Sequence, residues 1–201
     1  MVLFNTVSYP EVILEAAIKL FLEKGYANTS MDEIASAVGL TKGGIYYYID
    51  KKEDLLISIH NEFLNELCIK ADEQIDEDAD ALDNLMSFIS VEANIVKKYQ
   101  RSIRIFFAEM HYIPENDLKI MFEARKYVQK TLENIINLGI KRGTIRKDCD
   151  PKIISLLILG MVNWIYTWYR ADGEKSFEHI TDEINKLIIN GIGNYDTRTQ
   201  V

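Results

Sequence analysis

The sequence contains few cysteines, whose disulfides stabilise many secreted proteins. Its two cysteines, Cys68 and Cys149, lie far apart and outside any CxxC pattern. We therefore expect two small buried hydrophobic side chains in a reducing cytoplasm rather than a disulfide, a metal site or a redox switch. The first eight residues lack the cationic start and the apolar run of a signal peptide. The expected location is the cytoplasm.

Long apolar runs are also missing. The most apolar stretch, 153–168, is interrupted by Ser155, Asn163 and Thr167 and falls short of the ~18 residues that a membrane-spanning helix needs. We predict a buried helix there and no membrane partner.

Catalytic and metal-binding patterns are absent as well. The three histidines, His60, His111 and His179, have no Glu-x-x-His partner for a di-iron site. The chain contains no Ser-His-Asp grouping, no glycine-rich phosphate loop and no Cys/His metal motif. The sequence therefore predicts a protein that is not an enzyme and needs neither a cofactor nor a metal.

Positive charge is scarce at the N-terminal end. The first 60 residues hold five lysines, no arginine and eight acidic residues, in a chain of net charge −8. General affinity for nucleic acid scales with the number of phosphates neutralised, so it should be weak here. Because salt limits the reach of charges to about 8–10 Å, a few well-placed contacts matter more than the total.

What the chain does contain is helical patterning almost throughout, with all three prolines at expected helix starts. Gly143 and Gly173 stand where C-cap glycines would end two helices. We predict an all-α fold of about nine helices, with a helix-turn-helix domain over 1–52 and a ligand-binding and dimerisation bundle over 53–201. The start of the linking helix, to about residue 60, belongs with the DNA-binding domain. Beyond the helix-turn-helix, the expected helices run over 53–74, 81–98, 100–111, 115–142, 151–170 and 176–192.

The stretch Thr29–Leu56 is the most informative part of the chain. Ser30 and Glu33 have the spacing of a capping box, which marks a helix start. An apolar face at helical spacing follows, and Gly39 is placed to close this helix. Thr41 then opens a second helix after a very short break, which is the arrangement of a helix-turn-helix.

The second helix is unusual in its exposed residues. Lys42, Tyr46 and Tyr47 should face outward, where phosphates and base edges of DNA would lie. Gly43 and Gly44 each cost about 1 kcal/mol of helix stability relative to alanine, which is tolerable if the backbone must come close to DNA. The residues expected to hold this helix to the scaffold are Ile45 and Ile49.

The first 60 or so residues resemble the DNA-binding domain of TetR-type transcriptional regulators. The matching residues are Phe21, Gly25, Tyr26, Thr29, Ser30, Ile34, Ala35, Val38, Gly39, Thr41, Lys42, Gly43, Ile45, Tyr46, Tyr47, Tyr48, Lys52, Glu53 and Leu55. Ile49 departs from the family, which usually has phenylalanine there. The resemblance implies phosphate contacts at Thr29, Ser30, Tyr46 and Lys52. It also implies groove-facing or base-reading residues at Thr41, Lys42, Gly43 and Tyr47.

The last two expected helices carry apolar stripes too wide for one neighbour to cover. A helix-turn-helix reads two half-sites of a palindrome, so it needs a twofold partner. We therefore expect a homodimer formed through helices 153–170 and 176–192. The TetR resemblance implies the same four-helix interface.

The middle helices are rich in aromatic residues and methionine, which are more often plain core than a binding site. The TetR resemblance nevertheless implies a pocket for a small hydrophobic ligand among them. The candidate ligand-binding residues are Phe63, Phe88, Arg104, Phe107, Met110, Met121, Arg125, Trp164, Trp168 and Arg170.

The segment 165–184 is similar to one found in the TetR subgroup that senses acyl-CoA thioesters, with Ala171 in place of a proline. The arginines all lie in the second half of the chain, and arginine binds phosphate well. We therefore expect a repressor that binds a palindromic double-stranded operator as a dimer and is released by an acyl-CoA. Two alternatives remain open: a regulator of drug efflux with a drug-like or aromatic ligand, and a helical binding protein without DNA activity.

Overall fold

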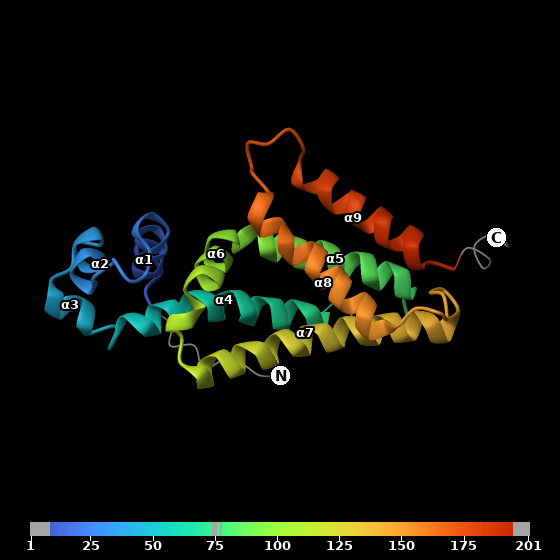
Figure 1. The fold of residues 1–201 in the computed structure, drawn as a ribbon, viewed down its shortest axis with the longest axis horizontal. Coiled ribbons are helices and arrows are strands. Elements are labelled where there is room, and N and C mark those ends of the chain that lie inside the picture. Colours follow the sequence, from blue (N-terminus) through green and yellow to red (C-terminus); the bar gives the residue numbers. More distant parts are fainter. Residues whose placement is uncertain (1–8, 74–75, 77, 195–201) are drawn as a thin grey trace. The chain divides into compact units, whose positions relative to one another are not determined.

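The computed structural model describes residues 9–73, 76 and 78–194, and this part of the chain forms nine α-helices and one 3-10 helix (Figure 1). In order they are α1 (Glu11–Lys24), α2 (Met31–Ala37), α3 (Lys42–Tyr46), α4 (Lys52–Glu73), α5 (Ala81–Lys98), α6 (Gln100–Glu109), η1 (Met110–Tyr112), α7 (Glu115–Arg142), α8 (Pro151–Trp168) and α9 (Phe177–Ile192). The predicted all-α fold is confirmed.

Two predicted helix ends are wrong. The helix expected over 100–111 leaves α-helical geometry after Glu109 and continues as η1. The helix expected to reach Arg170 ends at Trp168, because Tyr169 adopts an extended conformation and its ring packs against Phe177 at 5.1 Å. Gly173 is therefore part of the following turn and not a C-cap. Gly143 does have the expected left-handed φ, at +77°.

The described residues separate into two compact units, one formed by residues 9–65 with 99–124 and the other by residues 66–98 with 125–194, apart from the undescribed 74, 75 and 77. Helices α4 and α7 each contribute residues to both units. The functional boundary predicted after residue 52 stays a prediction.

The first unit is built on the apolar face of α1. Ile13, Ala17 and Phe21 are buried on that face, and α1 packs against both α2 and α6. His60 of α4 stacks on Phe106 of α6, with ring centroids 3.7 Å apart. Helix α6 therefore shares its core with the helix-turn-helix.

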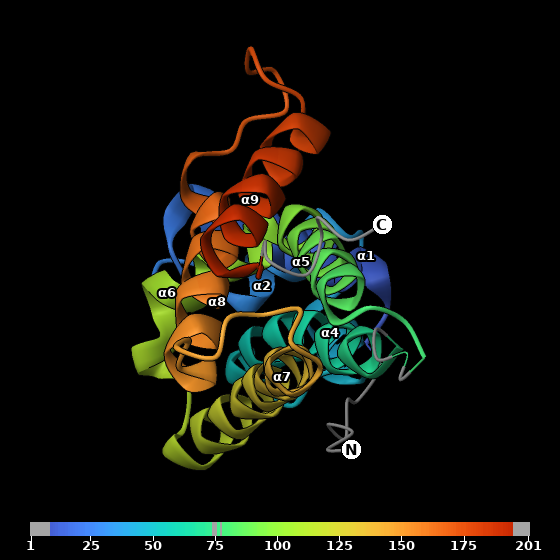
Figure 2. The ribbon, with the colours of Figure 1, turned by 90° about the vertical axis from the view of Figure 1, so that its right-hand side faces the viewer.

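In the second unit α5 packs against α8 and α9 (Figure 2). The expectation that α8 is a buried helix is wrong for the single chain. Its inner face, including Ile158 and Val162, is buried, whereas Leu157 and Trp164 on its other side are 58% and 61% exposed. No helix in the described residues is long and apolar enough to cross a membrane.

The two cysteines are free thiols. Cys68 is buried as expected, and burial raises the pKa of its thiol to about 11. Cys149 is only partly buried, because it lies in the turn between α7 and α8 rather than on an inner helix face.

Candidate DNA-binding surface

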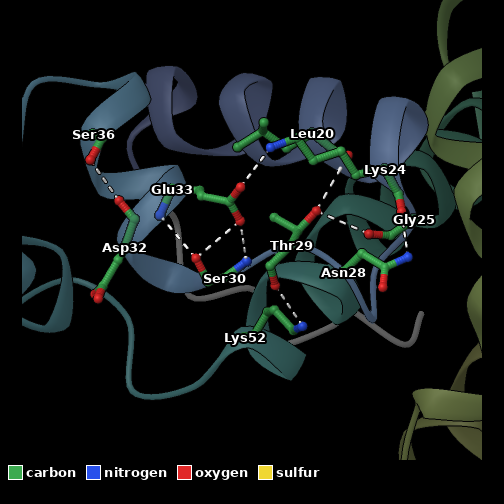
Figure 3. A network of polar contacts seen from close by, with 10 residues as sticks. All are labelled: Leu20, Lys24, Gly25, Asn28, Thr29, Ser30, Asp32, Glu33, Ser36 and Lys52. Carbon is green, nitrogen blue, oxygen red and sulfur yellow. Dashed lines mark hydrogen bonds and ion pairs between the residues drawn. The ribbon is translucent and has the colours of Figure 1, made fainter.

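The capping box predicted at the start of α2 is present (Figure 3). The Glu33 N–H donates to the Ser30 hydroxyl at 3.2 Å, and the Ser30 N–H donates back to the Glu33 carboxylate at 2.9 Å. Lys24 binds the same carboxylate, and together with Ser30 it lowers the pKa of Glu33 to about 2. Helix α2 is thus fixed to the end of α1 at its first turn.

The turn between α2 and α3 is set by two backbone features. Gly39 has φ +71°, a left-handed conformation that glycine adopts without strain. The Thr41 hydroxyl accepts a hydrogen bond from the Gly44 N–H at 3.1 Å and so caps α3. Because these two features end one helix and begin the next within four residues, α3 leaves the turn in a fixed direction.

Helix α3 exposes the residues predicted to face DNA. Tyr47 is 83% exposed and Tyr46 is 43% exposed, while Ile45 and Ile49 are buried as predicted. The Tyr47 ring meets Tyr48 edge to face, with centroids 5.1 Å apart. The exposed tyrosines therefore lie opposite a face that is packed into the protein core.

Lys42 is exposed, and its ammonium group lies 3.1 Å from the carboxylate of Asp32 on α2. Both side chains are more than half exposed, so solvent screens this pair and it contributes little to stability. A DNA phosphate can therefore replace Asp32 as the partner of Lys42 at small cost.

The two glycines of α3 have different surroundings. A side chain at Gly43 would meet no atom within 4 Å, whereas a Cβ at Gly44 would lie 3.3 Å from the Thr41 hydroxyl. Nothing within the protein thus requires glycine at position 43. This agrees with the prediction that Gly43 allows another molecule to approach the backbone.

The side chains of Thr29 and Lys52 form hydrogen bonds within the protein. Thr29 is only 2% exposed, and its hydroxyl donates to the Gly25 carbonyl at 3.0 Å. The Lys52 ammonium donates to the Thr29 carbonyl at 2.8 Å (Figure 3). It also donates to the Tyr26 carbonyl at 2.7 Å. These two residues tie the start of α4 to the turn before α2, and their predicted phosphate contacts stay a prediction.

A link between α6 and the helix-turn-helix was missed at the sequence level. The Tyr26 N–H donates to the Glu109 carboxylate at 3.1 Å, and the Tyr26 ring packs on Tyr112 at 4.8 Å. Arg101 on α6 also pairs with Glu15 on α1 at 2.9 Å. An acidic residue near a helix end is too common to have revealed these contacts.

The predicted ligand residues divide between the two units. In the first unit Phe63 and Met121 are buried, Met110 is partly buried, and Arg104 and Phe107 are exposed. In the second unit Phe88 is buried and Arg125 partly buried, while the three residues Trp164, Trp168 and Arg170 are exposed. Ligand contact by any of these residues stays a prediction.

One feature of the second unit also escaped the sequence patterns. Phe88 lines a shallow recess between α4 and α5, and the wall of this recess includes Glu92, which is 2% exposed. A charged residue one helical turn after Phe88, on the apolar face of α5, was the signal that could have found it.

Two family models match the chain. One, described as bacterial regulatory proteins of the tetR family, covers residues 13–59. The other, described as the C-terminal domain of tetracyclin repressor-like proteins, covers residues 78–192, more than half of the chain. This protein belongs to the TetR family. It is therefore a DNA-binding transcriptional repressor and not an enzyme.

The individual relatives span nearly the whole chain. The fatty acid metabolism regulator protein of Bacillus subtilis is 26% identical over 90% of this chain and 94% of its own length. The crystal structure of PfmR from Thermus thermophilus has a TM-score of 0.82 and is 27% identical, over 89% of this chain and 97% of that one. A crystal structure of AibR with isovaleryl coenzyme A and operator DNA has a TM-score of 0.73 and is 29% identical, over 87% and 95%.

Proposed function

We propose that this TetR-family protein binds a palindromic operator as a homodimer and is released from it by an acyl-CoA. The exposed face of α3, with Tyr47 at 83% exposure on a buried Ile45–Ile49 base, is the observation that carries the DNA part. The AibR complex with isovaleryl coenzyme A and the fatty acid regulator of Bacillus subtilis support the effector part.

In this proposal α3 enters the major groove. Lys42 leaves Asp32 for a phosphate or a base edge, and the Tyr46 and Tyr47 hydroxyls contact the DNA. Thr41 and Gly43 allow the start of α3 to come close to the duplex. The remaining contacts with phosphate come from Ser30 at the start of α2 and Lys52 at the start of α4, while the buried Thr29 positions these two residues.

The dimer is proposed to form through α8 and α9. The exposed apolar residues on these two helices are Ile153, Leu156, Leu157, Trp164, Trp168 and Leu187. So large an apolar surface is unusual on a monomer and is typical of an interface. A twofold pairing of these helices would present two copies of α3 to half-sites about 34–36 Å apart.

The proposed release of DNA needs a route from ligand to α3. Helices α4 and α7 belong to both units, so a ligand that displaces either helix in the second unit moves the first. Within the first unit, Glu109 and Lys52 then connect α6 and α4 to the Tyr26 turn. Linkage requires operator and effector to weaken each other by the same factor.

The experiment is a fluorescence anisotropy titration on a DNA site that the purified protein selects from random duplexes. Saturating isovaleryl-CoA or palmitoyl-CoA should weaken binding to this site by about 5-fold to 150-fold, the usual range of allosteric coupling. Free coenzyme A is the control and should have no effect. Operator affinity that is unchanged by every acyl-CoA would contradict the effector part and leave the DNA part standing.

A further inference from the structure

A pocket of about 420 Å³ is formed by the start of α5 and the last turns of α7, within the second unit. Gly139 lets these two helices approach each other, because a Cβ at this position would lie 3.1 Å from the Cβ of Ala81. Pockets for small molecules have volumes of about 300–1,000 Å³, so this pocket has room for a metabolite. Its wall consists of Asn84, Asn134, Ile135, Asn137, Leu138, Lys141 and Arg142.

The polar side chains of this wall are amides and cations, with no acid among them. Lys141 and Arg142 give the wall two positive charges, in a chain whose net charge is −8. The Arg142 guanidinium donates to the Ala79 carbonyl at 2.8 Å, which fixes its position. The Lys141 ammonium forms no ion pair with any residue among 9–73, 76 and 78–194, so it can bind an anion without first losing a partner.

The asparagines add a second requirement to this positive charge. Asn84 is 4% exposed, and its side-chain N–H donates to the Asp76 carbonyl at 2.7 Å. The Asn137 side-chain N–H donates to the Glu133 carbonyl at 2.9 Å. These bonds leave the amide oxygens of Asn84 and Asn137 as acceptors, and neither oxygen receives a hydrogen bond within the described part of the chain. A ligand that satisfies the wall must therefore carry hydrogen-bond donors as well as negative charge.

Basic residues in the last turn of a helix also offset the helix dipole, so Lys141 and Arg142 alone would not indicate a site. The amide acceptors and the volume of the pocket are not explained in this way. A phosphate ester has a charge of about −1.5 to −2 at neutral pH, which matches two cations better than the single charge of a carboxylate does.

We propose that this pocket binds a small phosphate ester that carries hydroxyl groups, such as a sugar phosphate or a nucleotide. Lys141 and Arg142 bind the phosphate group, and the hydroxyl groups donate to the amide oxygens of Asn84 and Asn137. The carbon skeleton packs against Ile135, which is 2% exposed. The site does not depend on the proposed acyl-CoA response.

Calorimetric titration of the full-length protein with ribose 5-phosphate and with adenosine monophosphate tests this proposal. At least one ester should bind with a Kd below about 1 mM. Ribose, which lacks the phosphate, and inorganic phosphate, which lacks the hydroxyl groups of the sugar, should each bind at least about tenfold more weakly than the better ester. Either order of the two esters supports the site and identifies the class of ligand. Binding of neither ester, or binding of inorganic phosphate as tight as that of both esters, would overturn the proposal.

Two substitutions test whether the ester binds in this pocket. Lys141→Gln removes an exposed ammonium group and should weaken binding of the better ester by about tenfold, as expected for one charge-assisted hydrogen bond. Asn137→Leu keeps the size of the side chain but removes the acceptor, and should weaken binding by about fivefold.

The matched control is Lys147→Gln. Lys147 is an exposed lysine in the turn after α7 and is not part of the wall, so this variant should bind the ester within about twofold of the wild type because salt screens the lost charge. Thermal unfolding should be unchanged in both lysine variants. Equal losses of affinity in Lys141→Gln and Lys147→Gln would indicate a general effect of charge and overturn the proposal. Wild-type affinity in both Lys141→Gln and Asn137→Leu would also overturn it.

Discussion

The carboxylate of Glu109 accepts a hydrogen bond from the backbone N–H of Tyr26 at 3.1 Å. This contact joins residues 83 positions apart, at the end of α6 and in the turn before α2. The same turn receives the Lys52 ammonium group, which also lies 4.2 Å from the centroid of the Tyr26 ring. The position of the helix-turn-helix therefore depends on the end of α6 as well as on the start of α4.

Glu109→Ala should uncouple the effector from DNA. It leaves the Tyr26 N–H without its acceptor and should lower the free energy of unfolding by about 1–3 kcal/mol, as for other hydrogen bonds to charged groups. Operator affinity without effector should stay within about threefold of the wild type, but release by acyl-CoA should become weaker. Glu109→Gln retains an acceptor oxygen and should restore part of the response. An unchanged response in Glu109→Ala would show that α6 does not transmit it through this bond.

Gly43→Ala should separate folding from DNA binding. The new methyl group meets no atom of the protein within 4 Å, and alanine favours a helix by up to about 1 kcal/mol over glycine. Thermal unfolding should therefore occur at the same or a higher temperature. Operator affinity should nevertheless fall by about tenfold or more, because the methyl group occupies space that DNA needs. Gly44→Ala should instead disturb the Thr41 cap and lower stability.

Asp32→Asn should strengthen DNA binding. The substitution removes a negative charge next to the recognition helix and frees Lys42 from its 3.1 Å ion pair. We expect operator affinity to rise a few-fold, with a similar dependence on salt because Lys42 contacts the DNA in both proteins. Asp182→Asn on α9 removes the same charge far along the chain and is the matched control. If Asp32→Asn binds no better than this control, Lys42 does not make the proposed contact.

Leu157→Glu should prevent pairing. Leu157 is 58% exposed on α8 in the single chain, so a charge there leaves the fold of one chain intact but would be buried without a partner in a dimer. Sedimentation analysis should show a monomer, and binding to a two-half-site operator should fall by at least about tenfold. A dimer that survives both Leu157→Glu and Leu187→Glu would place the interface elsewhere.

Glu92 should give the stability of the protein a recognisable dependence on pH. Burial raises its pKa from 4.5 to about 8 on folding. The contribution of Glu92 to the free energy of unfolding is therefore most favourable at pH values below its pKa in the unfolded state. That contribution is lost as the pH rises through the folded value. Glu92→Gln should therefore gain stability relative to the wild type between about pH 4.5 and 8. Denaturant unfolding of both proteins at several pH values measures this difference, and parallel curves would contradict it.

Local patterns in the sequence were enough to predict the helix-turn-helix. The Ser30 and Glu33 cap, the turn at Gly39 and the buried Ile45 all depend on residues within one or two helical turns, and each is present. The bond from Glu109 to Tyr26 and the burial of Glu92 depend on helices distant in sequence. Periodicity predicts which face of a helix is buried, but it does not say which helix will cover that face.

The helix end after Trp168 shows the same limit. The apolar pattern continues to Tyr169, so the sequence predicted a helix as far as Arg170. Tyr169 instead packs against Phe177 from the next helix, and this contact takes the backbone out of the helix. A tertiary contact thus overrides the local preference.

The central claim is that the exposed face of α3 reads a specific DNA site. Anisotropy titrations of Lys42→Ala and Tyr47→Ala, each against the selected operator and a scrambled duplex of equal length, test it most directly. Both variants should remain folded, as measured by circular dichroism. Both should bind the operator and the scrambled duplex with similar affinity, because each lost base contact removes about 1–3 kcal/mol of discrimination between sequences. Preference for the operator retained by both variants at the wild-type level would contradict the claim.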